Sequence, residues 1–362
     1  MKKLIPFFFL ALVLFACKKE EDNNIIWEKA LGSGDAFFVR STADTGVIAC
    51  GRVSGKPYLV KFNSGKSIET DYTSERTGLF SSAWADNAGF IAAGSSTGKM
   101  LLSGIGIDGK KIWDATITAS FYLDITNIVY EGSGNFLAVG SASPDSSENM
   151  NARIFFVRFT REGQLIEKDS AETGFVSVNN VCTDGSGSLY LAVTRKSGSQ
   201  KPKAVIMKFN SDLQKLWETE LYNNPDFTAA CYDATADAFG NIIVTGRTEA
   251  SRLTAVLSNS FLASVSSSGA VNWKRYIENS NSGSSVIMNG TEEIFMLNRS
   301  CFIISRADSG DGAPNTTIRM FSQCDSFTTD AFGHDMNLDH DENILVAGSM
   351  GGNFYLALKS SQ

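Results

Sequence analysis

A short pattern that recurs along the whole chain constrains the fold more than any other feature. At 237–246 it reads DAFGNIIVTG, in which a turn of Asp, Gly and Asn residues opens an apolar run that a glycine closes. Seven copies occur, and they end at Gly51, Gly94, Gly140, Val193, Gly246, Leu297 and Gly348. Their spacing of 43 to 53 residues is typical of proteins that repeat one supersecondary unit.

Each copy has the composition and periodicity of β-strands rather than of a helix. The runs are rich in Val, Ile, Leu and Phe and show no helical periodicity. In the fifth copy we expect four strands, at 229–236, 241–246, 260–266 and 270–277. The second is uniformly apolar, as in a strand that is buried on both faces. A fourth strand at 216–221 alternates instead, with Trp217 and Thr219 on one face and Glu218 and Glu220 on the other, which indicates an outer strand.

These repeats predict an all-β fold, a seven-bladed β-propeller of four-stranded antiparallel blades. The last repeat ends after an expected third strand at Phe354 to Leu358, so its fourth strand is missing. Residues 25–31 (IIWEKAL) have the fourth-strand pattern that appears elsewhere as KIWDA and KLWET. We expect this N-terminal strand to pair with Phe354 to Leu358 and close the ring, which removes exposed sheet edges.

The first residues of the chain have the features of an export signal. Lys2 and Lys3 precede an apolar segment at 4–16 that is too short to span a bilayer stably. The sequence LFAC at 14–17 resembles the lipobox of bacterial lipoproteins, which implies that Cys17 is lipidated and becomes the new N-terminus. We therefore expect a signal peptide at 1–16, the lipidated cysteine with a charged tether at 17–24, and the propeller at 25–362. An ordinary signal peptide followed by a chance cysteine is the alternative.

The net charge and a family resemblance indicate the partner class and the subcellular location. Removal of Lys2 and Lys3 changes the formal net charge from −7 to −9, and no basic cluster remains, so nucleic acid is not an expected partner. The repeats resemble those of bacterial secreted and outer-membrane propeller lipoproteins, and a turn followed by Trp113 or Trp273 is similar to the quinoprotein-type repeat. With the charged tether KKEED at 18–22, this resemblance implies lipid anchoring in the cell envelope, at the outer membrane, on its surface or its periplasmic side.

The cysteines beyond position 17 divide into two groups. Cys50, Cys182 and Cys231 lie in expected inner strands and are interpreted as small core residues. Cys301 and Cys324 flank one expected hairpin, so in an exported protein they either form a disulfide or remain two buried thiols.

The sequence predicts no metal and no cofactor. His334 and His340 are the only histidines, and with unpaired cysteines they form no recognisable zinc site. Asp339, Asp341 and Asn343 alternate like the ligands of calcium loops, but the glycine and the distal glutamate of an EF-hand are missing. A hairpin turn is the favoured interpretation of this segment.

The innermost strands of a propeller line a central channel, whose polar members are candidates for a small-molecule site. These candidates are Arg40, Asn180, Asp233 and Asp335. Propeller channels are polar whatever the function, so a purely structural role is the alternative.

A second candidate site is the face that carries the longest connections. Insertions at 141–152, 195–203 and 248–259 share this long-loop face with the aromatic segments between blades, which contain Phe121, Tyr122, Tyr222 and Phe227. Long loops on a rigid scaffold often carry function, and aromatic residues are favoured anchors. We expect a protein or glycan partner on this face, pointing away from the membrane. Tolerated insertions without function are the alternative.

No catalytic constellation is visible in the sequence. A noncatalytic lipoprotein that uses its propeller as a binding scaffold is therefore predicted, and an outer-membrane assembly factor would be a special case of it. The alternative is a glycan-active or quinone-dependent enzyme, which would need paired carboxylates across the channel mouth or a cofactor pocket.

Overall fold

The computed structural model describes residues 25–144, 152–196, 201–222, 227–252, 255–277, 282–300, 302–312, 314–319 and 331–361. Within these ranges the chain forms strands and turns. A helix long and apolar enough to cross a membrane does not occur among them. Cys17, Cys301 and Cys324 lie outside the described residues, so the expectations about lipidation and the disulfide stay predictions.

Three of the sheets contain four antiparallel strands each. One consists of β5 (Leu79–Asp86), β6 (Gly89–Ser96), β7 (Lys99–Ile105) and β8 (Lys111–Ile117). A second consists of β16 (Phe227–Ala236), β17 (Ile242–Arg252), β18 (Ala255–Val265) and β19 (Val271–Ile277). The third consists of β20 (Gly283–Met288), β21 (Glu293–Asn298), β22 (Ile303–Asp308) and β23 (Pro314–Arg319).

Two further sheets contain seven strands each, because one long strand in each is shared by two groups. The first runs in the order β24 (Ala331–Leu338), β25 (Ile344–Met350), β26 (Asn353–Lys359), β1 (Ile25–Ser41), β2 (Val47–Val53), β3 (Lys56–Phe62) and β4 (Ile68–Thr73). The second runs in the order β15 (Lys215–Glu220), β14 (Lys203–Phe209), β13 (Leu189–Arg195), β12 (Leu165–Thr183), β11 (Ala152–Thr160), β10 (Asn135–Ser143) and β9 (Tyr122–Gly132).

The long strand β1 brings the two ends of the chain together. Its first part pairs antiparallel with β26 and places Trp27 opposite Leu358 and Leu31 opposite Phe354, the pairing that the sequence predicts for residues 25–31. Its second part pairs with β2. The strand β12 is shared in the same way by β11 and β13, so the backbone passes from one group to the next without a loop.

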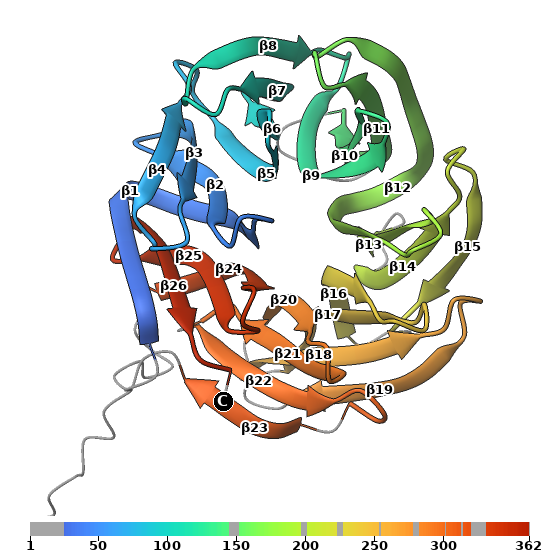
Figure 1. Cartoon of the computed structure of the whole chain (residues 1–362). Helices are drawn as coiled ribbons and strands as arrows, with labels where there is room; N and C mark the ends of the chain where they lie inside the picture. The colour runs from blue at the N-terminus through green and yellow to red at the C-terminus, as the bar shows by residue number, and fades with distance from the viewer. Residues whose placement is uncertain are drawn as a thin grey trace, which may run out of the picture.

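The sheets lie side by side around a common centre (Figure 1). The strands β5, β9, β16, β20 and β24 are nearest to this centre, and β8, β15, β19 and β23 lie at the rim. Burial is greatest between the centre and the rim: every residue of β13 except the last is buried, whereas buried and partly exposed residues mix in the inner strand β5. In the rim strand β15, Trp217 and Thr219 are half-buried while Glu218 and Glu220 are exposed, which confirms the predicted alternation.

Tryptophans on rim strands connect neighbouring sheets. The indole N–H of Trp113 donates to the carbonyl of Arg161 at 2.9 Å. Gly163 lies under the ring, where a Cβ would come within 2.7 Å of it, so only glycine permits this close approach. Equivalent contacts join Trp217 to Ser267 and Gly269, and Trp273 to Ser309 and Gly312.

A β-bulge recurs near the centre of the molecule, in β1, β5, β9, β12, β16, β20 and β24. The bulged residues are Phe37, Ser81, Thr126, Asn179, Tyr232, Ser284 and His334. A bulge leaves one residue unpaired and re-aims its neighbours. The residues just after the bulges can therefore reach the adjacent sheet and the central space.

Candidate functional site

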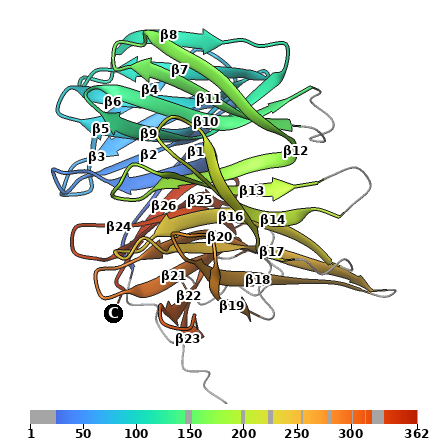
Figure 2. The ribbon, with the colours of Figure 1, turned by 90° about the vertical axis from the view of Figure 1, so that its right-hand side faces the viewer.

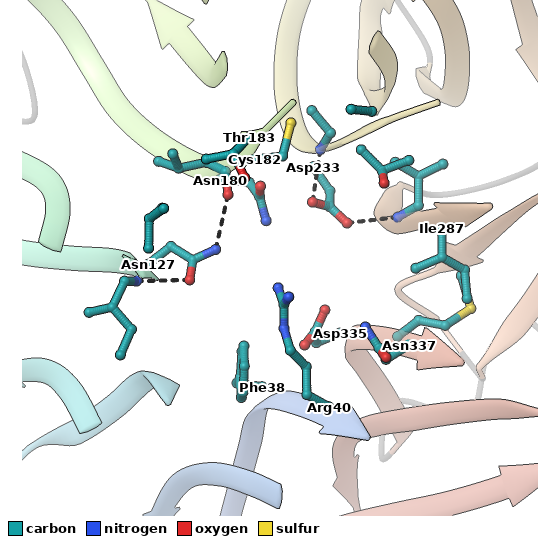
Figure 3. A pocket seen from close by; sticks show the side chains of 18 of the residues that line it. Phe38, Arg40, Asn127, Asn180, Cys182, Thr183, Asp233, Ile287, Asp335 and Asn337 are labelled. Atoms are coloured by element: carbon teal, nitrogen blue, oxygen red, sulfur yellow. Dashed lines mark hydrogen bonds between the residues drawn. The ribbon is translucent and has the colours of Figure 1, made fainter. Parts of the chain in front are cut away.

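The four channel candidates line one central cavity of about 420 Å³. Arg40 comes from β1, Asn180 from β12, Asp233 from β16 and Asp335 from β24, and the structure thus brings together residues that lie far apart in the sequence. Figure 3 shows Arg40 pointing into the middle of this space with Asp335 beside it. The wall comes from the part of each inner strand between the bulge and the following turn.

At five of the seven bulges, the residue one position later binds a neighbouring inner strand. Asp233 Oδ2 accepts the N–H of Val286 at 2.7 Å and the hydroxyl of Ser285 at 2.7 Å. Asp335 Oδ2 accepts the N–H of Val39 at 2.9 Å, and its other oxygen lies 3.4 Å from the hydroxyl of Ser285. Ser285 therefore lies between two carboxylates and links three neighbouring inner strands.

The same positions bind in the other half of the ring, with different chemistry. The hydroxyl of Ser82 donates to Asn127 at 2.6 Å and accepts the N–H of Ile128 at 3.2 Å. Asn127 in turn donates to the carbonyl of Val181 at 3.2 Å. The bulged residues add a parallel set of bonds to the next strand: Ser81 to Ile125, Thr126 to Val178, and Asn179 to Cys231.

These contacts give Asp233 and Asp335 a structural role, which the sequence left open as the alternative. Sequence reasoning missed the same role of Ser82, Asn127 and Ser285. A signal was present, because the inner strands carry FFV at 37–39, SSA at 81–83, TNI at 126–128, NNV at 179–181, YDA at 232–234, SSV at 284–286 and HDM at 334–336. Side chains that hydrogen-bond precede an apolar residue in most of these copies. The recurrence is hidden because Ser, Thr, Asn and Asp replace one another in it.

Burial and mutual repulsion act on the two carboxyl groups. Burial raises the pKa of Asp233 to about 7, and the negative charge of Asp335 adds to this effect. Burial also raises the pKa of Asp335, while its hydrogen bond from Val39 and the positive charge of Arg40 act in the opposite direction. At neutral pH the pair therefore carries less negative charge than two exposed aspartates would.

The long-loop candidates lie at two different junctions. Tyr222 follows β15 and Phe227 is the first residue of β16, and their rings meet edge to face at 5.5 Å. The structure adds two residues that sequence reasoning missed: Tyr276, whose ring lies 5.7 Å from that of Tyr222, and Lys274, whose ammonium lies 5.3 Å from the same ring. Both come from β19, more than fifty residues after Tyr222 in the chain, so no local pattern could indicate this contact.

Lys274 fixes this aromatic cluster. Its ammonium donates to the carbonyl of Leu221 at 2.7 Å and also lies 5.9 Å from the ring of Tyr276. Burial lowers the pKa of Lys274, and burial together with Tyr222 raises the pKa of Tyr276 to about 12. Tyr276 is nevertheless 42% exposed, so the cluster offers an aromatic surface to solvent.

Phe121 and Tyr122 lie at the junction between β8 and β9. The guanidinium of Arg153 lies 5.3 Å from the ring of Phe121. Tyr122 is 46% exposed and covers Gly98.

The prediction of a long loop at 248–259 is wrong. The strands β17 and β18 continue through this segment, with Thr248 opposite Asn259 and Arg252 opposite Ala255, and reach outward as a hairpin on the right of Figure 2. Pairing satisfies backbone groups that a loop would leave to solvent.

The segment at 339–343 is a turn, as interpreted from the sequence. Asp339 Oδ1 accepts the N–H groups of Asp341 and Asn343, both at 2.9 Å. Asp237 makes the same bonds in the turn of its own repeat. Among the described residues, no group of three or more His, Cys, Asp or Glu side chains is placed to hold a metal ion.

Two of the three cysteines expected in the core are buried there. Cys50 and Cys231 are fully buried, whereas Cys182 is partly exposed and lines the cavity, which corrects its interpretation as a simple core residue. All three are free thiols, and burial raises the pKa of each.

No family model and no curated protein matches the chain. Solved structures do match it in shape. Virginiamycin B lyase from Staphylococcus aureus superposes with a TM-score of 0.61 at 11% identity, over 92% of this chain and 99% of the lyase chain. YCF48, in a structure with bound D1 peptide, superposes with a TM-score of 0.57 at 10% identity, over 93% of this chain and 97% of its own.

Both of these proteins are β-propellers. This chain has the β-propeller fold. At such low identity the likeness concerns the fold alone, because one fold hosts many functions. Lyase chemistry and peptide binding therefore stay properties of those two propellers.

Proposed function

We propose that this chain is a noncatalytic lipoprotein of the cell envelope that uses its β-propeller as a binding scaffold. In this proposal residues 1–16 are removed as a signal peptide, Cys17 carries the lipid, and residues 17–24 tether the propeller at 25–362 to the outer membrane. The partner is a protein or a glycan. The lipobox-like sequence before Cys17 supports the lipid anchor. The acidic net charge, without a basic cluster in the sequence, argues against nucleic acid as the partner.

We also infer that the ring has seven blades and is closed by the N-terminal strand. The strands β1 and β12 each change pairing partners part-way along their length. When each is divided at that point, the sheets become seven groups of four strands. The seven recurrent bulges support the same count, since each belongs to the inner strand of one group.

The observation that carries the binding function is the aromatic cluster of Tyr222, Phe227 and Tyr276. Lys274 holds it in place, so a partner would meet a rigid surface and little side-chain entropy would be lost on binding. Aromatic side chains of this kind dominate the energetics of many interfaces. The cluster lies where a rim strand passes to the next inner strand, on the long-loop face.

The chemistry of the channel also favours a noncatalytic role. A catalytic pair of carboxyl groups needs oxygens that can face a substrate. Both oxygens of Asp233 and both of Asp335 instead lie near backbone N–H or hydroxyl donors of the protein.

Site-specific photocrosslinking on intact cells tests the binding face. A photoreactive amino acid at position 276 should capture the partner, whereas one at position 239 serves as the matched control. Phe239 is 74% exposed in the turn between β16 and β17, on the opposite face. Capture at 239 and none at 276 would show that the wrong face was chosen.

The captured partner should then be purified and its affinity measured against folded variants. Tyr276→Ala and Phe227→Ala should weaken binding by about tenfold or more, as expected for aromatic anchors, while Phe239→Ala should not. A membrane barrel as partner would place the chain among outer-membrane assembly factors. A glycan partner that is cleaved during the assay would contradict the noncatalytic proposal.

The lipid anchor has a separate test. Cys17→Ser should abolish lipidation and release the protein from the membrane fraction, because the lipid on Cys17 is the expected attachment to the membrane. Metabolic labelling with a radioactive fatty acid measures the first effect, and cell fractionation at high salt measures the second. A variant that stays with the membrane would refute the role of Cys17.

A further inference from the structure

The residues three positions after the bulges form one level of the central cavity. Only one of them, Arg40, is charged. The residues at this level are Arg40, Trp84, Val129, Cys182, Thr235, Ile287 and Asn337, and all of them line the cavity. Arg40 is exposed to the cavity, and its guanidinium lies 5.3 Å from the ring of Phe38. Among the described residues, no hydrogen bond or ion pair engages this guanidinium.

Arg40 differs in its hydrogen bonding from Asp233 and Asp335, which lie one position after their bulges, two positions nearer to the bulge than Arg40. The oxygens of Asp233 and Asp335 are engaged by donors from the protein, which offset their negative charge. The five N–H groups of a guanidinium need acceptors, and the cavity wall leaves them to solvent or to a ligand. An anionic group of a ligand would supply those acceptors, and a carboxylate matches the fork geometry of the guanidinium.

The neighbours of Arg40 indicate the rest of the ligand. Asn337 and Trp84 occupy the same level on the two adjacent inner strands, β24 and β5. The rings of Trp84 and Tyr130 stack at 5.0 Å with an interplanar angle of 26°, which gives one side of the cavity a flat aromatic wall. On the other sides, Asn180 and Thr235 present polar side chains that form no hydrogen bond to the described residues.

We propose that this cavity binds a small monocyclic carboxylate, with its acid group on Arg40 and its ring against Trp84 and Tyr130. The amides of Asn180 and Asn337 would then bind polar substituents of the ring. A volume of about 420 Å³ falls within the usual range of small-molecule sites. This site is independent of the partner-binding cluster on the long-loop face.

A titration with matched acid and neutral probes tests the proposal. The probes are benzoate with benzamide, cyclohexanecarboxylate with its amide, and galacturonate with galactose. Binding is followed by tryptophan fluorescence, because Trp84 lies in the wall, and by saturation-transfer NMR of the probe. At least one acid should bind more tightly than its neutral counterpart in the unmodified full-length protein.

Two arginine variants locate the acid group. Arg40→Gln should weaken binding of the acid by about tenfold, the loss expected for hydrogen bonds to a charged group, and leave the neutral probe unchanged. Arg52→Gln is the control, because Arg52 pairs with Asp35 outside this cavity. Trp84→Ala should weaken the binding of both the acid and the neutral probe, whereas Trp84→Phe should leave the affinity for both unchanged.

Three results would overturn the proposal. The first is equal affinity for acid and neutral probe in the unmodified protein, which needs no variant and so does not depend on variant folding. The second is an equal loss in Arg40→Gln and Arg52→Gln, which would indicate a long-range charge effect. The third is the absence of binding for every acid at millimolar concentration.

Discussion

Replacement of Asp233 by asparagine is expected to remove a pH-dependent destabilisation of the fold. The carboxyl has an ordinary pKa of 3.8, and burial beside Asp335 raises it to about 7 in the folded chain. Between these pH values the folded state holds the proton that the unfolded state releases. The free energy of unfolding of the wild type should therefore fall as the pH rises from about 4 to about 7.

The size of the effect follows from the same shift. One pKa unit corresponds to about 1.4 kcal/mol, so the contribution of Asp233 amounts to at most about 4 kcal/mol across this window. Asparagine does not titrate, but its amide nitrogen cannot accept a hydrogen bond. One of the two N–H groups of Ala234 and Val286 that the carboxylate now binds would therefore lose its acceptor. That loss should cost about 1–3 kcal/mol at every pH.

Urea unfolding of both proteins at a series of pH values separates the two contributions. The stability advantage of the wild type over Asp233→Asn should be largest near pH 4 and shrink, or change sign, above pH 7. Asp341→Asn, at an exposed turn residue, is the control for a simple change of charge. An advantage that stays constant, or that grows as the pH rises, would refute the assigned role of burial at Asp233.

Two further predictions concern the contacts that hold the ring. Gly163→Ala should destabilise the fold by about 2–4 kcal/mol, because its Cβ would meet the Trp113 ring at 2.7 Å. Gly132→Ala, which has a positive φ but open space around it, should cost only about 1 kcal/mol, and equal losses in thermal unfolding would contradict the ring contact. Deletion of residues 25–31 should leave the edge of β26 unpaired and promote association, which gel filtration measures; a monomeric variant would contradict this.

The sequence predicted the strands and their burial because these depend on local patterns. Apolar runs between turns marked the buried second strand of each group, and alternation around Trp217 marked the rim. The pairing of Trp27 with Leu358 could also be predicted, since a fourth strand was missing from one end and present at the other. The placement of Arg40 and Asp335 near the centre followed from the repeat alone.

Contacts between sheets could not be predicted in this way. The partner of Tyr222 is Tyr276, and the partner of Trp113 is the turn at Arg161, both about fifty residues farther along the chain. The repeat spacing varies, so an alignment of the copies does not fix which positions face each other. The role of Ser285 between two carboxylates depends on such a contact.

The position of β1 has a consequence for how the protein is made. Trp27 pairs with Leu358, so this part of the strand has no partner until residue 358 has left the ribosome. Contacts of such long sequence separation slow folding, because much chain entropy must be lost before they form. The pairing of β1 with β26 is therefore expected late in folding, after the sheets between these two strands have formed.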